Sequence, residues 1–555
     1  MKRKLAALAA LALAVSLLAG CSQSSLSWLK SKFQARDETV QAETAAASAS
    51  SASASASASA SASSAASGSA GTAIVTETAQ AVTSFGLGYQ ADYGLHPYNC
   101  ASLNNRVILS FLYEPLFAVD SAFQAVPVLA ESWEVSADGL TTTVHLRSGV
   151  TFHDGSAFTA EDAAYSLNAS RNSDYYGTRL SRVSSITAPD DATLVLTTDT
   201  AYECLPLLLD IPIIKNGTVN DANPVGTGPY TLDGTRLSRW SGWWQSAAPL
   251  VDFSEISLVS VDSASDIRDN FEYGKINLVV TDPNSAAYVG FHNDYELWTG
   301  DSTILQYIGY NLEDGVFTNY GLRAAVTFAI DRSAILADDL GGFGAPAVLP
   351  CSPQTSYYDA GLAADYGYNL TNFYAQLDSA GAKDEDGDGV LDLYFDSLGY
   401  SIPVSGKMIV CSTSPSNVAA AQDVVDALNA QGFQLTLEPL EYDAYHAALK
   451  AGNFDLYYGE VRLSANFDLS PFFRSGGSLS YGGLADDTLE GLCERALANN
   501  GNNYDLYKRI CQRGCLTPVL IKNLAVYSTR SAVTTPADYL DWFLPAALSQ
   551  ADAEK

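Results

Sequence analysis

The chain lacks the short motifs that mark common catalytic and nucleotide-binding sites. It has no H-E-x-x-H pair, no nucleophile elbow, no phosphate-binding glycine loop and no dinucleotide fingerprint. Histidine is scarce, with five residues scattered over 555 positions. Carboxylate pairs occur, but a chain with 62 Asp and Glu residues supplies such pairs by chance. We therefore expect a binding protein without a cofactor rather than an enzyme.

Positive charge is also scarce. Lys and Arg number 30 against 62 Asp and Glu, which gives a formal net charge of -32. A nucleic-acid-binding protein needs a basic surface to neutralise phosphates, so the composition argues against that class. The acidic surface favours solubility outside the cell. Attraction of cationic ligands into an acidic cleft is the alternative.

Long apolar runs are confined to the N-terminus. Basic residues 2–4 precede the apolar stretch 5–18, which is too short for a stable spanning helix and is typical of a signal peptide at residues 1–20. The letters L-A-G-C ending at Cys21 match a lipobox, which predicts that the mature chain begins there with a diacylglyceryl group on the thiol. Two acyl chains give stable anchoring. An ordinary secreted protein with a chance cysteine is the alternative.

Residues 21–84 contain little that could form a core. Residues 45–69 are almost purely Ser and Ala, which predicts a flexible tether. The weakly amphipathic stretch 26–33 could rest on a lipid surface or be disordered. A random-coil estimate gives the whole segment a reach on the order of 45 Å, which suits a receptor above a membrane permease.

Cysteine spacing indicates neither a metal site nor an assignable disulfide. Seven cysteines follow Cys21, so at least one is unpaired in a monomer. There is no C-x-x-C, and Cys511 and Cys515 lack nearby histidines that could complete a zinc site. We expect buried or partly reduced thiols.

Residues 405–464 show the pattern of an α/β sheet. Strands are expected at 407–411, 433–437 and 454–458, with helices at 417–428 and 442–450 between them. Pro415 suits the first helical turn, and Gly432 suits a helix end. This alternation predicts a parallel sheet with helices on its faces. Ligands in such sheets lie beyond the carboxyl ends of the strands, which places Ser412-Thr413 and 460–464 at a candidate cleft.

The first half shows shorter elements. Strands are expected at 85–89 and 141–146, and Thr159 with Asp162 three residues later resembles a capping box. Further strands are expected through Trp243-Trp244 and 256–259. The cluster of Trp240, Trp243 and Trp244 has two interpretations, a stacking platform for sugars or rings and ordinary packing.

Residues 126–167 contain the sequence motifs that say most about the class of this protein. They contain P-V-L-A-E-S-W-E-V-S-A-D-G, then H-L-R-S-G-V-T-F-H-D-G, then T-A-E-D-A-A-Y-S-L. This text resembles the extracellular solute-binding proteins of family 5, the oligopeptide-, dipeptide- and nickel-binding components of ABC importers. Further matches lie in family order at Leu112–Phe117 before this block, and at Gly226–Tyr230, Gly309–Asn311 and Leu322–Arg332 after it. The resemblance covers roughly Phe85 to Leu544.

The resemblance implies an α/β fold of the periplasmic-binding-protein type (class II, cluster C). Two lobes would be joined by hinge strands, and the first lobe would carry an extra β-rich subdomain. The expected segments are a signal peptide at 1–20, a lipid anchor and linker at 21–84, lobe I at 85–304 with the extra subdomain at about 114–222, lobe II at 305–520, a return to lobe I at 521–546 and a tail at 547–555.

The resemblance also implies a function. The protein would capture a solute, most simply an oligopeptide, by hinge closure and deliver it to an ABC permease and its ATPase. It would be a monomer held on the outer face of the bacterial cell membrane by the lipid on Cys21, in the periplasmic or cell-wall space. A receptor for a metal chelate or another small solute, and a sensory or adhesive lipoprotein without transport, are the alternatives.

The ligand-lining residues implied by the resemblance come from four segments. They are Asn99, Cys100, Ala101, Ser102, Tyr175, Tyr176, Tyr307, Gly309, Tyr310, Glu460, Arg462, Leu463, Ser464, Asn466 and Asp468. The family places an Asp against the α-amine of a peptide that pairs like an added strand, and this chain has Asn466 there. A neutral amide cannot form that charge-assisted contact, so Asp468 or Glu460 would have to replace it. Leu463 stands where the family often has Trp. Both departures favour the small-solute alternative.

The segment D-E-D-G-D-G-V-L-D at 384–392 partly matches a calcium loop. Its acidic residues at loop positions 1, 3, 5 and 9 are Asp384, Asp386, Asp388 and Asp392, and a glycine occupies position 6. Phe395 occupies position 12, where a bidentate Glu is needed. The family often carries such a turn without metal, so calcium binding and a metal-free turn both stay open, and no metal site is firm.

Overall fold

The computed structural model describes residues 82–173, 175–245, 251, 253–499 and 503–533. The predicted signal peptide, Cys21, nearly all of the linker, residues 534–546 of the return segment and the tail lie outside the described residues. Within the described ranges, none of the helices has the length and apolar content that crossing a membrane requires.

The described residues form alternating strands and helices. The strands are β1 (Phe85–Tyr89), β2 (Phe117–Val119), β3 (Ala125–Pro127), β4 (Ala130–Val135), β5 (Thr141–Leu146), β6 (Val183–Asp190), β7 (Thr193–Thr198), β8 (Tyr230–Asp233), β9 (Arg236–Arg239), β10 (Glu255–Ser260), β11 (Leu278–Thr281), β12 (Tyr295–Tyr310), β13 (Gly344–Pro346), β14 (Ala382–Lys383), β15 (Asp392–Phe395), β16 (Tyr400–Pro403), β17 (Ser405–Cys411), β18 (Gln434–Leu440), β19 (Leu456–Arg462) and β20 (Leu516–Thr529). The α-helices are α3 (Leu103–Leu112), α4 (Ala160–Ser170), α5 (Ala264–Glu272), α6 (Tyr320–Ala329), α7 (Arg332–Asp338), α8 (Ala360–Asp365), α9 (Leu370–Ala380), α10 (Pro415–Asn429), α11 (Tyr442–Ala451), α12 (Ser470–Phe473), α13 (Asp487–Ala498) and α14 (Tyr504–Arg513).

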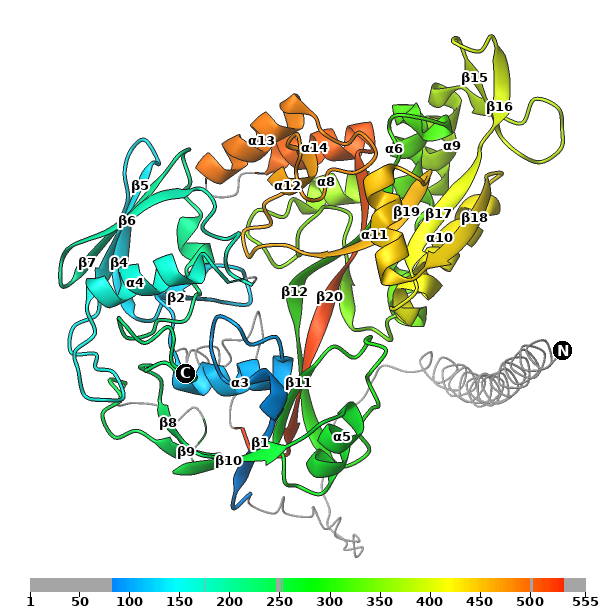
Figure 1. The fold of residues 1–555 in the computed structure, drawn as a ribbon. Coiled ribbons are helices and arrows are strands. Elements are labelled where there is room, and N and C mark those ends of the chain that lie inside the picture. Colours follow the sequence, from blue (N-terminus) through cyan, green and yellow to red (C-terminus); the bar gives the residue numbers. More distant parts are fainter. Residues whose placement is uncertain (1–81, 174, 246–250, 252, 500–502, 534–555) are drawn as a thin grey trace, which may run out of the picture. The chain divides into compact units, whose positions relative to one another are not determined.

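One mixed sheet runs through both halves of the described chain (Figure 1). Its order is β18-β17-β19-β12-β20-β11-β1-β10-β9-β8, with β13 paired to β20. The two long strands β12 and β20 pair along most of their length, and their register shifts between Asp301 and Leu305. We call this irregular stretch the crossing. The names lobe I (85–304 and 521–533) and lobe II (305–520) follow the boundaries predicted above, which stay predictions.

The predicted α/β pattern of lobe II is confirmed. β17 pairs in parallel with both β18 and β19, and Pro415 lies in the first turn of α10. Successive residues of β17 alternate between faces, since Met408 and Val410 pack with α10 while Ile409 packs with α11. Helices therefore cover both faces of the parallel strands, as an all-buried parallel sheet requires.

Lobe I confirms most of the predicted local structure and corrects one strand. β5 occupies the predicted residues 141–146, and its side chains alternate between buried and half-buried positions. Thr159 and Asp162 form the predicted capping box of α4. The strand expected through Trp243-Trp244 is wrong, because β9 ends at Arg239 and a turn follows, in which the Trp243 amide bonds to the Trp240 carbonyl. β10 lies where a strand was expected at 256–259.

The smaller sheets extend the two lobes. β4-β5-β7-β6 form a four-stranded antiparallel sheet inside the segment predicted as the extra subdomain, with α4 packed against β6 and β7. β2 and β3 form a hairpin whose tip carries Phe123. Phe123 is buried among lobe II residues, so this hairpin of lobe I contacts lobe II directly.

Candidate functional site

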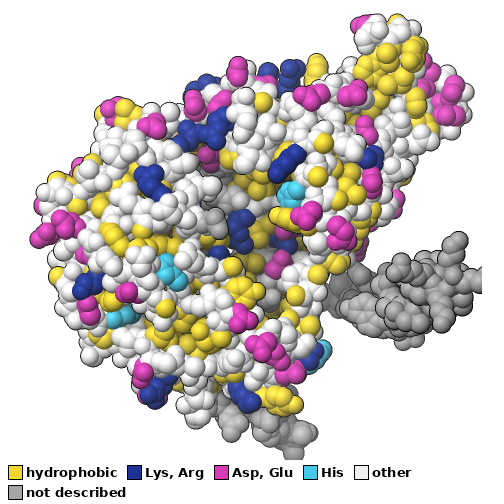
Figure 2. All heavy atoms as spheres, in the orientation of Figure 1, with side chains coloured by type: hydrophobic (Ala, Val, Ile, Leu, Met, Phe, Trp, Pro, Cys, Tyr) yellow, Lys and Arg dark blue, Asp and Glu magenta, His cyan; other side chains and the backbone are white. Residues whose placement is uncertain are grey.

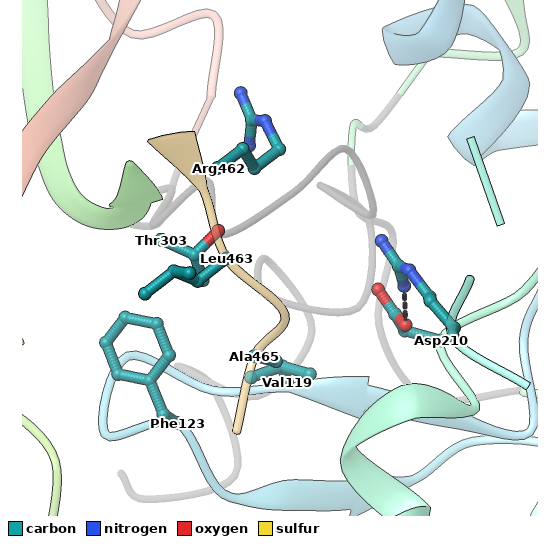
Figure 3. Close-up of a pocket in the computed structure, with 8 residues that line it drawn as sticks. Val119, Phe123, Asp210, Thr303, Arg462, Leu463 and Ala465 are labelled. Carbon is teal, nitrogen blue, oxygen red and sulfur yellow. Dashed lines mark hydrogen bonds and ion pairs between the residues drawn. The ribbon is translucent and has the colours of Figure 1, made fainter. Parts of the chain in front are cut away.

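A pocket lies where the two lobes meet, and residues of both lobes line it (Figure 3). Its empty volume is about 360 Å³, open solvent included. Its lining residues are Val119, Phe123, Arg179 and Asp210 from lobe I, Thr303 at the crossing, and Arg462, Leu463 and Ala465 from lobe II. The space-filling view shows a hollow near the middle of one face in which Lys and Arg side chains gather (Figure 2).

The lobe I wall carries a fixed ion pair. The Arg179 guanidinium donates to the Asp210 carboxylate, and the two side chains are 15% and 5% exposed. Arg179 also lies over the ring of Tyr176, with its guanidinium carbon 5.0 Å from the ring centroid. Asp210 follows the apolar run 205–209, which packs into the lobe I core and thereby holds the carboxylate at the pocket wall.

The lobe II wall carries a guanidinium without such a partner. Arg462 is the last residue of β19, and its side chain is exposed. Among the described residues, no ion pair to Arg462 is found. In Figure 3, Arg462 lies across the pocket from Asp210, the ion-pair partner of Arg179. The pocket therefore presents two guanidinium groups and one carboxylate, a net charge of one positive unit.

Apart from Thr303, the rest of the pocket is lined by apolar side chains. Behind this lining, Phe123 meets Phe467 edge to face with ring centroids 5.0 Å apart, in the same apolar cluster as Leu463. Both phenylalanines have left-handed backbone conformations, with φ of 57° and 49°. Such φ values are strained for a residue with a bulky side chain, so tertiary packing must hold them.

Two of the predicted ligand-lining residues, Arg462 and Leu463, line this pocket. Tyr176 supports it by packing against Arg179, and Tyr175 packs against Tyr176 with ring centroids 4.9 Å apart. The guanidinium of Arg106 lies 3.5 Å from the Tyr175 ring centroid, so that ring is covered by a cation of the protein itself.

The predicted segment 99–102 lies at the start of α3. Asn99 and Ala101 are exposed, whereas Cys100 is buried with its thiol 3.7 Å from the Ser102 carbonyl oxygen. Ser102 caps the helix, because its hydroxyl accepts from the Asn105 amide. The side chains of Cys100 and Ser102 are thus engaged within lobe I.

The predicted residues of β12 are buried in lobe II. Tyr307 packs edge to face against Tyr457 and Phe472, and the Tyr310 hydroxyl hydrogen-bonds to the Thr517 hydroxyl at 2.7 Å. A Cβ atom at Gly309 would meet the Tyr457 ring at 2.2 Å. This close approach explains why glycine stands at that position.

The loop after β19 places the amine-recognition candidates away from the pocket. Asn466 is buried, and its amide donates to the Tyr202 hydroxyl at 2.8 Å while its oxygen accepts from the Ser464 hydroxyl at 2.6 Å. Asp468 accepts from the amide and hydroxyl of Ser470 at 2.8 and 2.5 Å. Neither side chain lines the pocket, and the Glu460 carboxylate is bound at the crossing by Lys522.

The carboxylate in the pocket, Asp210, was missed by sequence reasoning. It stands alone in the apolar stretch L-P-L-L-L-D-I-P-I-I, and a single acid within such a stretch is a signal that a buried charge has a partner. Phe123, Arg179 and Thr303 carry no comparable local signal.

The predicted calcium loop at 384–392 has its first three acidic residues on the surface. Asp384, Asp386 and Asp388 bring carboxylate oxygens within 4.8 Å of one another, but all three are exposed, and Asp392 accepts from the Glu385 amide instead. The loop's own amides bond to Asp384 as well, at 2.7 Å from Gly387. Calcium binding stays a prediction.

Two members of the tryptophan cluster contact a buried acid. Trp243 and Trp244 donate their indole N–H groups to the Glu114 carboxylate, each at 3.0 Å. Burial raises the pKa of Glu114 to about 7, although these two donors and nearby Arg147 act in the opposite direction. The geometry favours packing over a stacking platform.

All seven cysteines after Cys21 are free thiols, and only Cys411 among these is not fully buried.

Comparison with known proteins identifies the family. The model of bacterial extracellular solute-binding proteins, family 5, matches residues 124–480. A glutathione-binding protein GsiB of Pectobacterium atrosepticum is 28% identical over 285 residues, which cover 47% of this chain and 54% of the relative. The corresponding protein of Salmonella typhi is 28% identical over 282 residues, which cover 47% and 55%. The matched part thus spans about half the length of these relatives.

Solved structures share the fold at lower identity. The ABC transporter substrate-binding protein CtaP of Listeria monocytogenes aligns with a TM-score of 0.64 and 19% identity over 81% of this chain and 94% of that one. The oligopeptide-binding protein AppA of Bacillus subtilis, in complex with a nonapeptide, gives 0.55 and 20% over 83% and 97%. NikZ of Campylobacter jejuni, in complex with Ni(L-His), gives 0.58 and 16% over 80% and 94%. These neighbours establish the two-lobe binding-protein fold, and the family match over more than half of the sequence shows that this chain belongs to the bacterial extracellular solute-binding proteins, family 5.

Proposed function

We propose that the chain captures a short peptide in the pocket between its lobes and delivers it to an ABC importer. The observation that carries this proposal is the placement of Asp210 and Arg462 on facing walls of the pocket. A zwitterionic peptide has an ammonium group at one end and a carboxylate at the other. Asp210 would attract the ammonium group, and Arg462 would bind the carboxylate through charge-assisted hydrogen bonds.

The pocket favours a small, acidic member of this class. Its empty volume of about 360 Å³ includes open solvent, so the enclosed space is smaller than that figure. Its two guanidinium groups and one carboxylate complement a tripeptide with two carboxylates and one ammonium group. Glutathione has this charge set, and relatives at 28% identity are named for binding it. We therefore place glutathione first among the peptides to test.

A metal chelate is the second candidate. Asn466 stands where the family's amine-binding Asp is expected, and its amide is already engaged by Tyr202. A ligand without a free α-amine would not need that Asp. The carboxylates of a histidine chelate could instead bind Arg462, and a neighbour in the fold comparison holds Ni(L-His).

The cellular context completes the proposal. Cleavage before Cys21 and lipidation of its thiol would hold a monomeric protein on the outer face of the bacterial cell membrane, with 21–84 as the tether. The ABC permease and its ATPase would be the partners. Neighbouring permease and ATPase genes would separate this function from a sensory or adhesive lipoprotein.

Calorimetric titration of the full chain carrying Cys21→Ser tests the ligand. We expect glutathione to bind and the glutathione diamide, which lacks both carboxylates, to bind at least about tenfold more weakly. Arg462→Met should reduce that discrimination, because it removes one of the two guanidinium groups that line the pocket. Arg474→Met is the matched control, because Arg474 is exposed and does not line the pocket.

Native mass spectrometry of protein purified gently from cells supplies the complementary test. A series of co-purified peptide masses would support a general peptide receptor, and one mass at that of glutathione would support the narrower assignment. Saturable binding of Ni(L-His), with no response to any peptide, would overturn the peptide proposal in favour of the chelate.

A further inference from the structure

A lysine is buried at the crossing between the lobes. Lys522 lies on β20 beside the register shift of β12, and its side chain is 3% exposed. Its ammonium group lies 2.7 Å from a carboxylate oxygen of Asp282 and 3.3 Å from one of Glu460. We call Asp282, Lys522 and Glu460 the crossing triad.

The two acids of the triad belong to different lobes. Asp282 follows β11 of lobe I, whereas Glu460 lies on β19 of lobe II. Their side chains are 23% and 29% exposed, so water screens them only in part. Without a cation between them, two carboxylates so placed would repel each other, and the repulsion would favour separation of the lobes.

The lobe II side of the triad is rigidly held. The Glu460 carboxylate also accepts from the side-chain amides of Gln306 and Asn417, at 3.0 and 3.1 Å. Gln306 is fixed in turn, because its oxygen accepts from the Tyr458 hydroxyl at 2.9 Å. Glu460 therefore cannot turn away from Lys522 without breaking this network.

The lobe I side has its own link to lobe II. The Asp282 carboxylate accepts a hydrogen bond from the backbone N–H of Asn284 at 2.9 Å. The backbone carbonyl of Asn284 accepts from the Ser416 hydroxyl of lobe II at 3.2 Å. The segment after β11 thus meets the start of α10 next to the triad. A change of lobe orientation would strain this contact and the triad together.

The electrostatics of the triad favour the charged lysine. Burial alone would lower the pKa of Lys522, but the Glu460 and Asp282 carboxylates outweigh burial and raise it above its ordinary value. The ammonium form of Lys522 therefore persists across the physiological pH range, and the triad keeps its positive charge.

We propose that Lys522 is a positioning residue that stabilises the closed arrangement of the lobes by holding Asp282 and Glu460 together, without touching the ligand. Apparent affinity for the solute falls in proportion to the fraction of protein in the binding-competent state. Lys522 therefore sets the affinity of the interlobe pocket from a distance. This inference goes beyond the proposed function, since it holds whatever solute the pocket takes.

The test measures lobe separation in the ligand-free chain. Spin labels are attached through a ketone-bearing amino acid at Tyr273 of lobe I and Tyr368 of lobe II, whose side chains are 80% and 52% exposed. Double electron–electron resonance then gives the interlobe distance in the Cys21→Ser background. Because no ligand is added, failure of the peptide proposal cannot be mistaken for failure of this one.

Four variants separate repulsion from simple loss of packing. Lys522→Met should shift the distances to longer values and raise the apparent Kd of whichever solute binds about tenfold. Glu460→Gln, which keeps Lys522 paired with Asp282, should lengthen the distances less. Adding Glu460→Gln to Lys522→Met should shorten them again, because it removes one of the two repelling charges. Lys407→Met, which breaks a surface pair of 2.9 Å with Glu438, should leave them unchanged.

The proposal is overturned by either of two results. Lys522→Met could leave the distance distribution as it is in the unaltered chain. The double variant could instead be as open as Lys522→Met or more so, which would mean that lost packing rather than repulsion separates the lobes. If Lys522→Met does not fold, Glu460→Gln alone decides, since its distances either lengthen or stay the same.

Discussion

Lys522 and Glu114 are both buried ionisable groups, but different neighbours surround them. Lys522 has two carboxylates within 3.3 Å, and these keep its pKa above the ordinary value despite burial. Glu114 accepts hydrogen bonds from the neutral indoles of Trp243 and Trp244, and burial raises its pKa to about 7 because these donors and nearby Arg147 offset the desolvation only in part.

The comparison shows that the partners of a buried group, more than its burial, decide its charge. A carboxylate near Lys522 lowers the energy of the ammonium form, whereas an indole N–H compensates only part of the desolvation of Glu114. Lys522 should therefore act as a permanent charge and Glu114 as a group that changes charge near neutral pH.

The largest effect is expected from removing the permanent charge. Lys522→Met leaves two partly buried carboxylates facing each other, and we expect it to lower the free energy of unfolding by about 3–4 kcal/mol at pH 8. Glu114→Gln should cost far less at that pH, because an amide oxygen can still accept from the indoles. Urea denaturation of both variants measures the difference. Equal losses would contradict the comparison.

The second effect is the pH dependence that Glu114 confers. Its folded pKa of about 7 lies above the ordinary 4.5, so between these values the folded chain binds more protons than the unfolded chain. Stability from this group is therefore fully present below pH 4.5 and is lost as the pH rises through 7, by about 3 kcal/mol in all.

Glu114→Gln is the variant that isolates this dependence. Its melting temperature should lack the decline that the unaltered chain shows between pH 4.5 and 7. A decline of the same size in both proteins would assign the pH dependence to other groups.

The third effect concerns the indole donors. Trp244→Phe removes one N–H from Glu114 and should lower stability by about 1 kcal/mol. Because that donor favours the charged carboxylate, its loss should move the pKa of Glu114 higher. The pH midpoint of the tryptophan fluorescence measures this shift. Trp240→Phe is the control, since Trp240 packs against His153 instead, with ring centroids 5.2 Å apart.

Sequence reasoning recovered the elements that depend on local pattern. β5, the Thr159–Asp162 capping box and the parallel β17, β18 and β19 lie where side-chain alternation and capping residues indicated. These signals need only neighbours within a few residues. The expected strand at Trp243-Trp244 failed because the two indoles are used to bind Glu114, which lies 129 and 130 residues earlier.

The pocket could be predicted only in small part for the same reason. Arg462 and Leu463 were found through family resemblance, but Asp210 and Phe123 reach the pocket only after the lobes have come together. Asn466 was expected to face ligand, yet its partner is Tyr202, which lies 264 residues away in the sequence. No local pattern encodes a contact between lobes.

The smallest effect is expected at an exposed carboxylate whose pKa moves in the direction opposite to that of Glu114. Hydrogen bonds from Lys215, the stronger influence, and Ser156 lower the pKa of Asp154 to about 2. Stability from Asp154 is therefore present above its ordinary pKa of 3.8 and is lost as the pH falls through 2. Because the side chain is 41% exposed, water screens the pair, and Asp154→Asn should cost only a few tenths of a kcal/mol.

Melting curves of this variant and the unaltered chain should differ slightly at pH 6 and converge as the pH falls toward 2. A loss at pH 6 as large as that of Lys522→Met would mean that exposure does not weaken a charge pair in this protein, and would contradict the role assigned here to burial.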